Sequence, residues 1–274
     1  MLPVDRRYRI LERVAEQQSI HIGELAEELG VSEMTIRRDV ARLERDGFLK
    51  RTYGGATAHL TRSLELAFNA RALQHAAAKR LIGMTAARLV ANAGWLTLFA
   101  GIGTTAEQFA QFLPAREDLT VITGSLPIAS LLGTRPVRVV ILGGTVRTDE
   151  LSCIGPVAGG TVRRYHADAA VLGAAGLSVP HGITELNDDE AEIHRLMVEH
   201  SERLVVIADG SKLGTTAAAW VAPTEAIHTL VTDESAPADQ VERFRAAGVR
   251  VLLARHPTLA EAHPAPAATA SPGS

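Results

Sequence analysis

Two adjacent threonines, Thr104 and Thr105, stand where a chain could hold an anion. They follow Gly103 in the segment LFAGIGTTAEQFAQFLP, which has the pattern of an apolar strand, a glycine-containing turn and a helix. Backbone N–H groups at a helix start attract negative charge, and threonine hydroxyls are further hydrogen-bond donors. The segment therefore predicts a phosphate cradle. A well-capped helix after a buried strand is the alternative interpretation of the same residues.

Further glycine-containing turns follow other apolar segments, in TGSLPIA, LGGTV and CIGP. The segment ADGSK places Lys212 just after another apolar segment, where its ammonium could pair with a phosphate; a solvated lysine is the alternative. In open α/β sheets the ligand crevice lies at the carboxyl ends of the strands. These turns are therefore expected to belong to one binding site.

Two carboxylates, Glu190 and Asp209, are candidates for the general base of a sugar-phosphate isomerase or hydrolase. Helix capping or solvation explains them equally. The ten histidines are scattered without the spacing of metal ligands, and there is no Gly-x-Ser-x-Gly nucleophile turn. We therefore expect no metal, no cofactor and no enzymatic activity.

An arginine-rich segment, residues 33–46, has a helical pattern with one basic face. At about 100° per residue, Ile36, Val40 and Leu43 form a buried stripe. The opposite side carries Met34, Arg38, Arg42 and Arg45, with Thr35 at its edge. The acidic residues of this helix lie within roughly 80° of the buried stripe, so phosphate meets no carboxylate on the outer face. That face suits the major groove of DNA; a solvated arginine face is the alternative.

The elements around this helix predict a winged helix-turn-helix. Helical patterns cover residues 6–17 and 22–29, and Gly30 ends the second of them. Ser32 is a favourable N-cap for the arginine-rich helix, which is expected to stop at Gly47. Residues 48–53 have an extended pattern, and Gly54 and Gly55 turn the chain into a small hairpin.

The rest of the chain predicts an α/β sheet that is mostly parallel. Residues 64–93 are alanine-rich and helical and are expected to connect two domains. Seven short apolar segments then alternate with helical patterns such as 105–113, 187–201 and 238–247. The apolar segments are 95–100, 119–123, 137–142, 168–174, 203–208, 227–233 and 249–254. Residues 255–274 are rich in Ala and Pro and are expected to be disordered.

Composition bounds the class of protein. The 274 residues carry a net charge of -3, and 46% are hydrophobic, as in a soluble globular protein with a sizeable core. The single cysteine, Cys153, excludes an internal disulfide framework. Neither a signal peptide nor an apolar stretch long enough to cross a membrane is present, so we expect a cytoplasmic protein without membrane association.

The run IGELAEELGVSEMTIRRDVARLERDGFLKRTYGGA, residues 22–56, resembles the winged helix-turn-helix of the DeoR-type bacterial transcriptional regulators. The resemblance implies that Ser32, Thr35, Arg37 and Arg38 contact DNA and that Lys50 and Arg51 of the wing touch phosphate. Met34 and Arg42, from the basic face, complete the expected interface. Tyr53 departs mildly from the family, which often has His there.

The later segments DAAVLGAAGL and DDEAEIHRLMVEHSERLVVIADGSK, together with Arg71 and Lys79, resemble the C-terminal domain of the same family. That domain is similar in fold to sugar-phosphate isomerases such as ribose-5-phosphate isomerase and senses phosphorylated sugars or related metabolites. The resemblance implies that Gly103, Thr104 and Thr105 hold a phosphate. It places Ser125, Gly144, Glu190 and Lys212 around the rest of the ligand.

Four positions depart from the family pattern. Gly101 stands where Asp is common, Gly124 where Asn is common, His194 where Lys is usual and Gly210 where Ser is usual. The loss of the Asp and the Asn together removes two hydrogen-bonding partners of a sugar. Either the ligand therefore differs from the common ones or it binds more weakly.

Taken together, the sequence predicts an N-terminal winged helix-turn-helix over residues 1–58, a connecting helical segment over 59–93, a sugar-phosphate-isomerase-like α/β sensor domain over 94–254 and a tail over 255–274. The expected function is that of a repressor of carbohydrate metabolism genes, a homo-oligomer that binds a double-stranded DNA operator and responds to a phosphorylated sugar or polyol. Two alternatives stay open. One is an isomerase-like enzyme with an added helical domain, and the other is a module that uses the winged helix to bind proteins.

Overall fold

The computed structural model describes residues 6–7, 9–10, 13–14, 17, 19–45, 49–52, 54–58, 72, 74–148 and 150–255. Several predictions fall outside these residues: the helix stop at Gly47, the departure at Tyr53, the family residue Arg71, most of the connecting segment before residue 74 and the tail from residue 256. The elements before residue 59 and those after residue 73 are described in turn.

The N-terminal elements form a winged helix-turn-helix. Residues 6, 7, 9, 10, 13, 14 and 17 are helical and precede α2 (Ile22–Leu29) and α3 (Glu33–Arg45). Gly30 ends α2 in the left-handed conformation, with φ of 63°. A three-stranded antiparallel sheet has the order β1 (Ser19–His21), β3 (Gly55–Ala58), β2 (Leu49–Thr52). The hairpin of β2 and β3 was predicted, whereas β1 was not.

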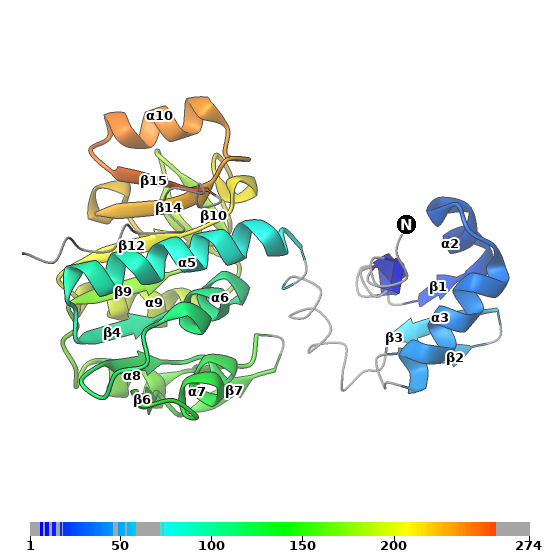
Figure 1. The fold of residues 1–274 in the computed structure, drawn as a ribbon, viewed down its shortest axis with the longest axis horizontal. Coiled ribbons are helices and arrows are strands. Elements are labelled where there is room, and N and C mark those ends of the chain that lie inside the picture. Colours follow the sequence, from blue (N-terminus) through cyan, green and yellow to red (C-terminus); the bar gives the residue numbers. More distant parts are fainter. Residues whose placement is uncertain are drawn as a thin grey trace, which may run out of the picture.

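A seven-stranded parallel sheet organises the remaining chain (Figure 1), and its strands are the seven predicted apolar segments. Their order is β15 (Arg250–Ala254), β14 (Thr229–Asp233), β12 (Leu204–Ile207), β9 (Ala169–Leu172), β4 (Thr97–Ala100), β5 (Thr120–Thr123) and β6 (Arg138–Ile141). Both faces of a parallel sheet are buried, which explains why these segments are apolar throughout.

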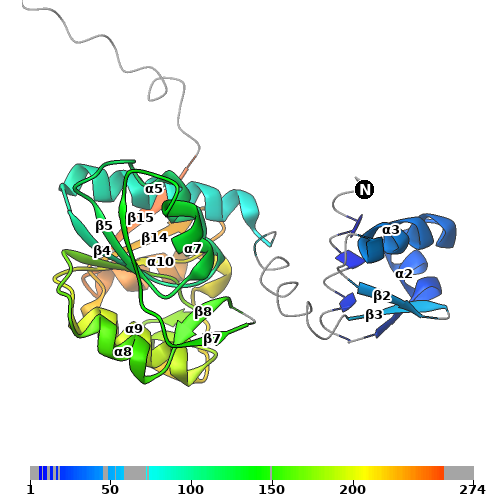
Figure 2. The same ribbon diagram turned by 90° about the horizontal axis from the view of Figure 1, so that it is seen from below.

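Helices cover both faces of this sheet, as Figure 2 shows for α5 and α7 on one side and α8 and α9 on the other. One core lies under α5 (Ala76–Ala93), α6 (Thr104–Phe112) and α7 (Leu126–Leu132). The other lies under α8 (Pro156–Val162), α9 (Asp188–Glu199) and α10 (Ala238–Ala246). Successive strand residues alternate between the two cores: Leu98 and Ala100 enter the first, and Phe99 enters the second.

Short elements that the sequence did not indicate are attached to this sheet. They are the hairpin of β7 (Thr145–Arg147) and β8 (Ser152–Ile154), the antiparallel sheet of β10 (Gly176–Ser178), β11 (Gly182–Glu185) and β13 (Ala219–Ala222), and the 3₁₀ turns η1 (Gly210–Lys212) and η2 (Thr224–Ala226). No helix among the described residues is long and apolar enough to span a membrane.

The strand order reverses between β4 and β9. From β4 the chain continues to β5 and β6 on one side, and from β9 it continues to β12, β14 and β15 on the other. In open α/β sheets a ligand crevice forms at such a reversal, outside the carboxyl ends of the strands. The fold thus points to the ends of β4 and β9 as the place to search for a ligand site.

Candidate nucleic-acid interface and ligand pocket

The arginine-rich helix α3 has the buried stripe that its periodicity predicted. Ile36, Val40 and Leu43 are buried in the N-terminal core. Ser32 caps the helix, because its Oγ accepts a hydrogen bond from the N–H of Thr35 at 3.3 Å and lies 2.9 Å from the Thr35 hydroxyl. The cap and the stripe together determine which side of α3 faces outward.

The outward side of α3 carries the residues predicted to contact DNA. Met34 is 66% exposed, although it is a large apolar side chain. The other exposed members of the predicted set are Ser32, Arg37, Arg38, Arg42, Lys50 and Arg51, and Thr35 is half-buried. Lys50 and Arg51 lie on β2, opposite Thr57 and Ala56 of β3. The predicted residues therefore form an accessible basic surface.

Acidic residues of α3 engage some of these arginines. Arg37 pairs with Glu33 at 3.0 Å, and Nε of Arg51 lies 2.7 Å from Glu44, which also accepts the N–H of Arg51. A phosphate would have to replace these carboxylates. Arg38, by contrast, makes no ion pair with another residue in the described part of the chain.

The third carboxylate of α3 belongs to Asp39, which is buried and holds the inward side of the helix. Its Oδ2 accepts a hydrogen bond from Nε of Arg6 at 2.6 Å. The bond joins the first helical segment to α3 across 33 residues of sequence. Because the carboxylate points inward, it leaves the outward side of α3 basic, as the periodicity predicted.

A pocket of about 150 Å³ opens at the carboxyl ends of β4, β9 and β12, where the strand order reverses. The turns that follow these three strands line it, together with the start of α5, the end of β11, the start of α9 and Glu150 of the β7–β8 hairpin. Five of the predicted ligand residues line it: Gly103, Thr104, Thr105, Glu190 and Lys212.

One side of the pocket is suited to an anion. Helix α6 begins at Thr104, and Gly103 before it has a φ of 95°, which an L side chain rarely adopts. The first N–H groups of any α-helix lack partners within the helix. Thr105, Lys79 and Lys212 also line this pocket. These groups suit a phosphate.

Lys79 is the pocket lysine that sequence reasoning did not place in the site. It is only 5% exposed and lies on the buried face of α5 with Ile82, Gly83 and Ala86. Those residues follow it at the i+3, i+4 and i+7 positions, which share one helix face. A lysine on an otherwise small and apolar face was the signal that could have indicated a polar role.

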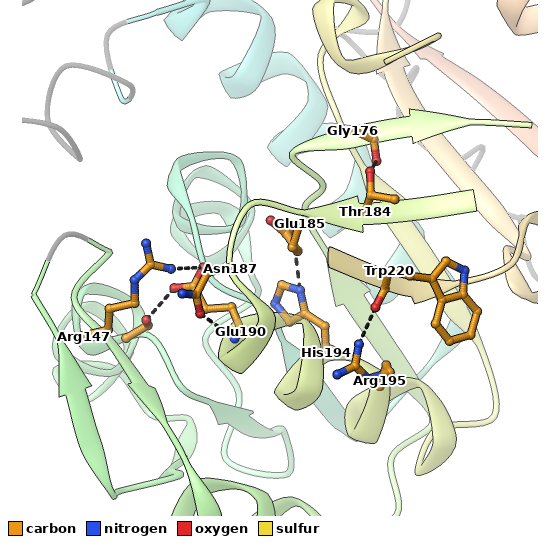
Figure 3. Close-up of polar contacts among 10 residues, drawn as sticks. Arg147, Gly176, Thr184, Glu185, Asn187, Glu190, His194, Arg195 and Trp220 are labelled. Carbon is orange, nitrogen blue, oxygen red and sulfur yellow. Dashed lines mark hydrogen bonds and ion pairs between the residues drawn. The ribbon is translucent and has the colours of Figure 1, made fainter. Parts of the chain in front are cut away.

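The pocket is also rich in carboxylates: Glu150, Glu185, Glu190 and Asp209 line it. Glu190 is held from two directions (Figure 3): Ser152 donates a hydrogen bond to its Oε1 at 2.8 Å, and Arg147 pairs with its Oε2 at 2.7 Å. Burial raises the pKa of Glu190, and the neighbouring Glu150 adds to the rise, against the opposite effects of Ser152, Arg147 and His194. Carboxylates so placed can accept hydrogen bonds from the hydroxyls of a polyol.

Two residues expected near the ligand do not line this pocket. Ser125 is buried, and its hydroxyl caps α7 by accepting the N–H of Ile128 at 3.3 Å. Gly144 has a φ of 98°, and a β-carbon there would lie 2.8 Å from the carbonyl oxygen of Ile154. Both residues follow strands β5 and β6, whereas the pocket is built on β4, β9 and β12. The structure assigns them roles in the backbone of neighbouring turns.

Packing accounts for the departures at two further glycines. A β-carbon on Gly210 would lie 2.3 Å from the backbone nitrogen of Ala236, so no side chain fits there without a backbone shift. A β-carbon on Gly124 would lie 3.2 Å from the carbonyl oxygen of Cys153. The close approach of the backbone therefore excludes a side chain at Gly210 without a backbone shift and leaves only tight space for one at Gly124.

The chain matches two known protein families. The family described as "DeoR-like helix-turn-helix domain" matches residues 6–61, and that described as "DeoR C terminal sensor domain" matches residues 74–234. The HTH-type transcriptional regulator GlpR of Haloferax volcanii is 33% identical over 252 residues, which cover 92% of this chain and 98% of that protein. The HTH-type transcriptional repressor CsqR of Escherichia coli is 30% identical over 249 residues, which cover 90% and 94%.

Among solved structures, ribose 5 phosphate isomerase A from Neisseria gonorrhoeae is similar to part of this chain. The match covers 49% of this chain and 52% of that one, with 19% sequence identity and a TM-score of 0.34. The relatives from Haloferax volcanii and Escherichia coli, which match over at least 90% of this chain, are named as transcriptional regulators and not as enzymes.

Proposed function

The chain belongs to the DeoR family of transcriptional regulators, and from this membership we propose that it is a repressor of carbohydrate metabolism genes. In this proposal α3 enters the major groove of a duplex operator. A phosphorylated sugar or polyol binds the pocket of the C-terminal domain and releases the DNA. The protein would act in the cytoplasm, where both partners are found.

The composition of the pocket is the observation that carries the choice of effector. The start of α6 at Thr104 lies in the same pocket as Lys79 and Lys212, and these groups suit a phosphate dianion. Carboxylates, among them Glu150 and Glu190, also line the pocket and suit hydroxyl groups. A ligand that carries both a phosphate and hydroxyl groups matches this combination.

Binding as a homo-oligomer is part of the proposal. One winged helix presents few side chains to the bases, and two copies related by a two-fold axis would read a palindromic or repeated site. Regulation then requires that the effector bind the DNA-free and DNA-bound states unequally, because only a difference in affinity shifts their populations.

A thermal-shift screen of phosphorylated sugars and polyols tests the proposed effector class. A ligand that binds only the native state raises the melting temperature as its concentration exceeds its Kd. We expect at least one phosphorylated compound to stabilise the full-length chain and its non-phosphorylated counterpart to have no effect. The stabilising compound should then dissociate a preformed complex with operator DNA. A screen in which phosphorylated and non-phosphorylated compounds behave alike would contradict the proposed effector class.

A further inference from the structure

His194 of α9 lies enclosed directly behind the wall of the pocket. It is 1% exposed, and neither of its ring nitrogens has a hydrogen-bond partner among the described residues. Buried polar groups are hydrogen-bonded in the large majority of cases, so an exception requires an explanation. One carboxylate lies within ion-pair distance of the ring.

That carboxylate belongs to Glu185, at the end of β11. Its Oε1 lies 3.4 Å from Nδ1 of His194, as the dashed line in Figure 3 marks. The side chain of Glu185 is 12% exposed and lines the pocket. His194 is therefore connected to the ligand site through the side chain of Glu185.

The surroundings of His194 contain few other groups that change charge. The elements packed against α9 are α8, β8, β9, β11 and β13, and their described residues include only two titratable side chains, Cys153 and Glu185. On α9 itself, Glu190 precedes His194 by one turn and interacts with it electrostatically. Glu190 also has Arg147 as an ion-pair partner.

Two of the pocket carboxylates, Glu185 and Glu190, thus have partners of different chemistry. The guanidinium of Arg147 stays charged across the pH range in which histidine titrates, so it compensates Glu190 throughout. The imidazole of His194 carries a charge only when it is protonated, so it compensates Glu185 only under that condition. When the imidazole is neutral, it no longer offsets the charge of Glu185.

We propose that His194 is a positioning residue of the effector pocket, whose imidazolium neutralises Glu185 and so admits an anionic ligand. The inference rests on the proposed function, because it takes the pocket to be an anion site. Protonated, the pair of His194 and Glu185 has no net charge; deprotonated, it carries one negative charge beside the bound anion. Anion binding therefore weakens as the pH rises.

Sulfate is the probe that isolates this effect, because its charge does not change across the range in which histidine titrates. Its affinity for the full-length chain is measured by titration calorimetry at constant ionic strength, between about pH 5.5 and about pH 8.5. We expect the sulfate affinity to fall on the order of tenfold over this range, because the negative charge of Glu185 would repel the sulfate dianion across the pocket and solvent partly screens that repulsion.

Three variants at the pair test the assignment. His194→Gln removes the charge and should give weak binding at every pH. His194→Lys keeps a positive charge and should give tight binding at every pH. Glu185→Gln removes the negative charge that His194 would neutralise, so it should also abolish the pH dependence of sulfate binding. This variant provides the test if a change at the enclosed His194 prevents folding. His166→Gln is the matched control, because His166 is exposed, does not line the pocket and pairs with Glu202; it should reproduce the wild-type profile.

The outcomes separate this inference from the proposed function. Sulfate binding with no pH dependence in the wild type would overturn the role of His194 and leave the anion site intact. A fall in sulfate affinity with pH that persists unchanged in both His194→Gln and Glu185→Gln would also overturn the role of His194 and leave the anion site intact. No sulfate binding at any pH, together with no difference between the wild type and a Thr104→Val/Thr105→Val variant, would overturn the anion site and the inference with it.

Discussion

Gly101 and His194 are neighbours in the core of the C-terminal domain. A β-carbon on Gly101 would lie 3.3 Å from Nε2 of His194 and 3.2 Å from the Cα of Leu172. The sequence was expected to depart from the family pattern at both positions, where Asp and Lys are common. An Asp and a Lys at these two places would bring side chains of opposite charge together, so we expect the two positions to be energetically coupled.

The first prediction concerns this coupled pair. Gly101→Asp alone should destabilise the domain by about 2–4 kcal/mol, because it adds a buried carboxylate in a space that barely accommodates a β-carbon. Adding His194→Lys supplies a cation, so the double variant should recover at least about 1 kcal/mol of that loss. Urea unfolding of the wild type, both single variants and the double variant measures the coupling. Strictly additive effects would show that the two positions are independent.

The second prediction concerns the outward side of α3. Arg38→Ala should weaken operator binding by roughly 1–3 kcal/mol, the cost of one lost contact to a base edge. The fold should be unaffected, because Arg38 is exposed and lies away from the stripe of Ile36 and Val40. A gel-shift titration at moderate salt measures the affinity, and Arg243→Ala on the exposed side of α10 is the control. Unchanged affinity would mean that α3 is oriented differently on the DNA.

The third prediction concerns Thr104 and Thr105. Replacing both with Val keeps their size and branching but removes two hydroxyl donors from the pocket. Operator affinity should be unchanged, whereas the effector concentration needed for release should rise by at least about tenfold, since hydrogen bonds to charged groups contribute about 1.5–3 kcal/mol each. An effector titration of the preformed DNA complex provides the measurement. Thr134→Val, an exposed threonine that bonds only to the carbonyl of Leu131, is the control. Identical release curves would place the phosphate elsewhere.

The fourth prediction concerns Asp233, which supports the turn that carries Lys212. It accepts the N–H of Gly210 at 2.8 Å and that of Ser235 at 3.1 Å. Burial alone would raise the pKa of Asp233, but the hydrogen bonds from Ser235 and Gly210 outweigh it and hold the pKa below the ordinary value of 3.8.

Because this pKa is lowered in the folded state, the ionised carboxylate stabilises the fold above the ordinary value, and that contribution is lost as the pH falls through the folded-state value. Asp233→Asn should therefore cost about 1–3 kcal/mol at neutral pH. The difference in the free energy of unfolding between the wild type and Asp233→Asn should become smaller below pH 3.8. Urea unfolding at neutral pH and below pH 3.8 measures this difference, with the exposed Asp239→Asn as the control. A difference that does not change with pH would mean that the variant is destabilised through packing.

The fifth prediction is that the protein associates with itself. Reading a two-fold operator requires two copies of α3, so we expect a dimer or a larger homo-oligomer at micromolar concentration. Light scattering with and without operator DNA measures the mass. A monomer under both conditions would contradict the proposed mode of binding.

Local patterns in the sequence were sufficient for the main elements. The spacing of Ile36, Val40 and Leu43 predicted the buried side of α3, and Ser32 marked its start. Each of the seven apolar segments became a strand of the parallel sheet, because a strand buried on both faces has a continuous apolar pattern that neighbouring residues alone reveal. The threonines after Gly103 likewise indicated the start of α6.

Tertiary structure decided which residues meet. The strands β1, β7, β8, β10, β11 and β13 have only three or four residues each and were not predicted, and they exist through pairing with other strands, such as β1 with β3 and β11 with β13. The order of the large sheet put the ends of β4, β9 and β12 together and left Ser125 and Gly144 on neighbouring turns. Lys79 and Glu185 line the pocket and His194 lies behind Glu185; they come from a helix, a short strand and another helix, and no local signal predicts that they lie close together. Periodicity depends on neighbours along the chain, whereas a site depends on the sheet order and the burial that bring its side chains together.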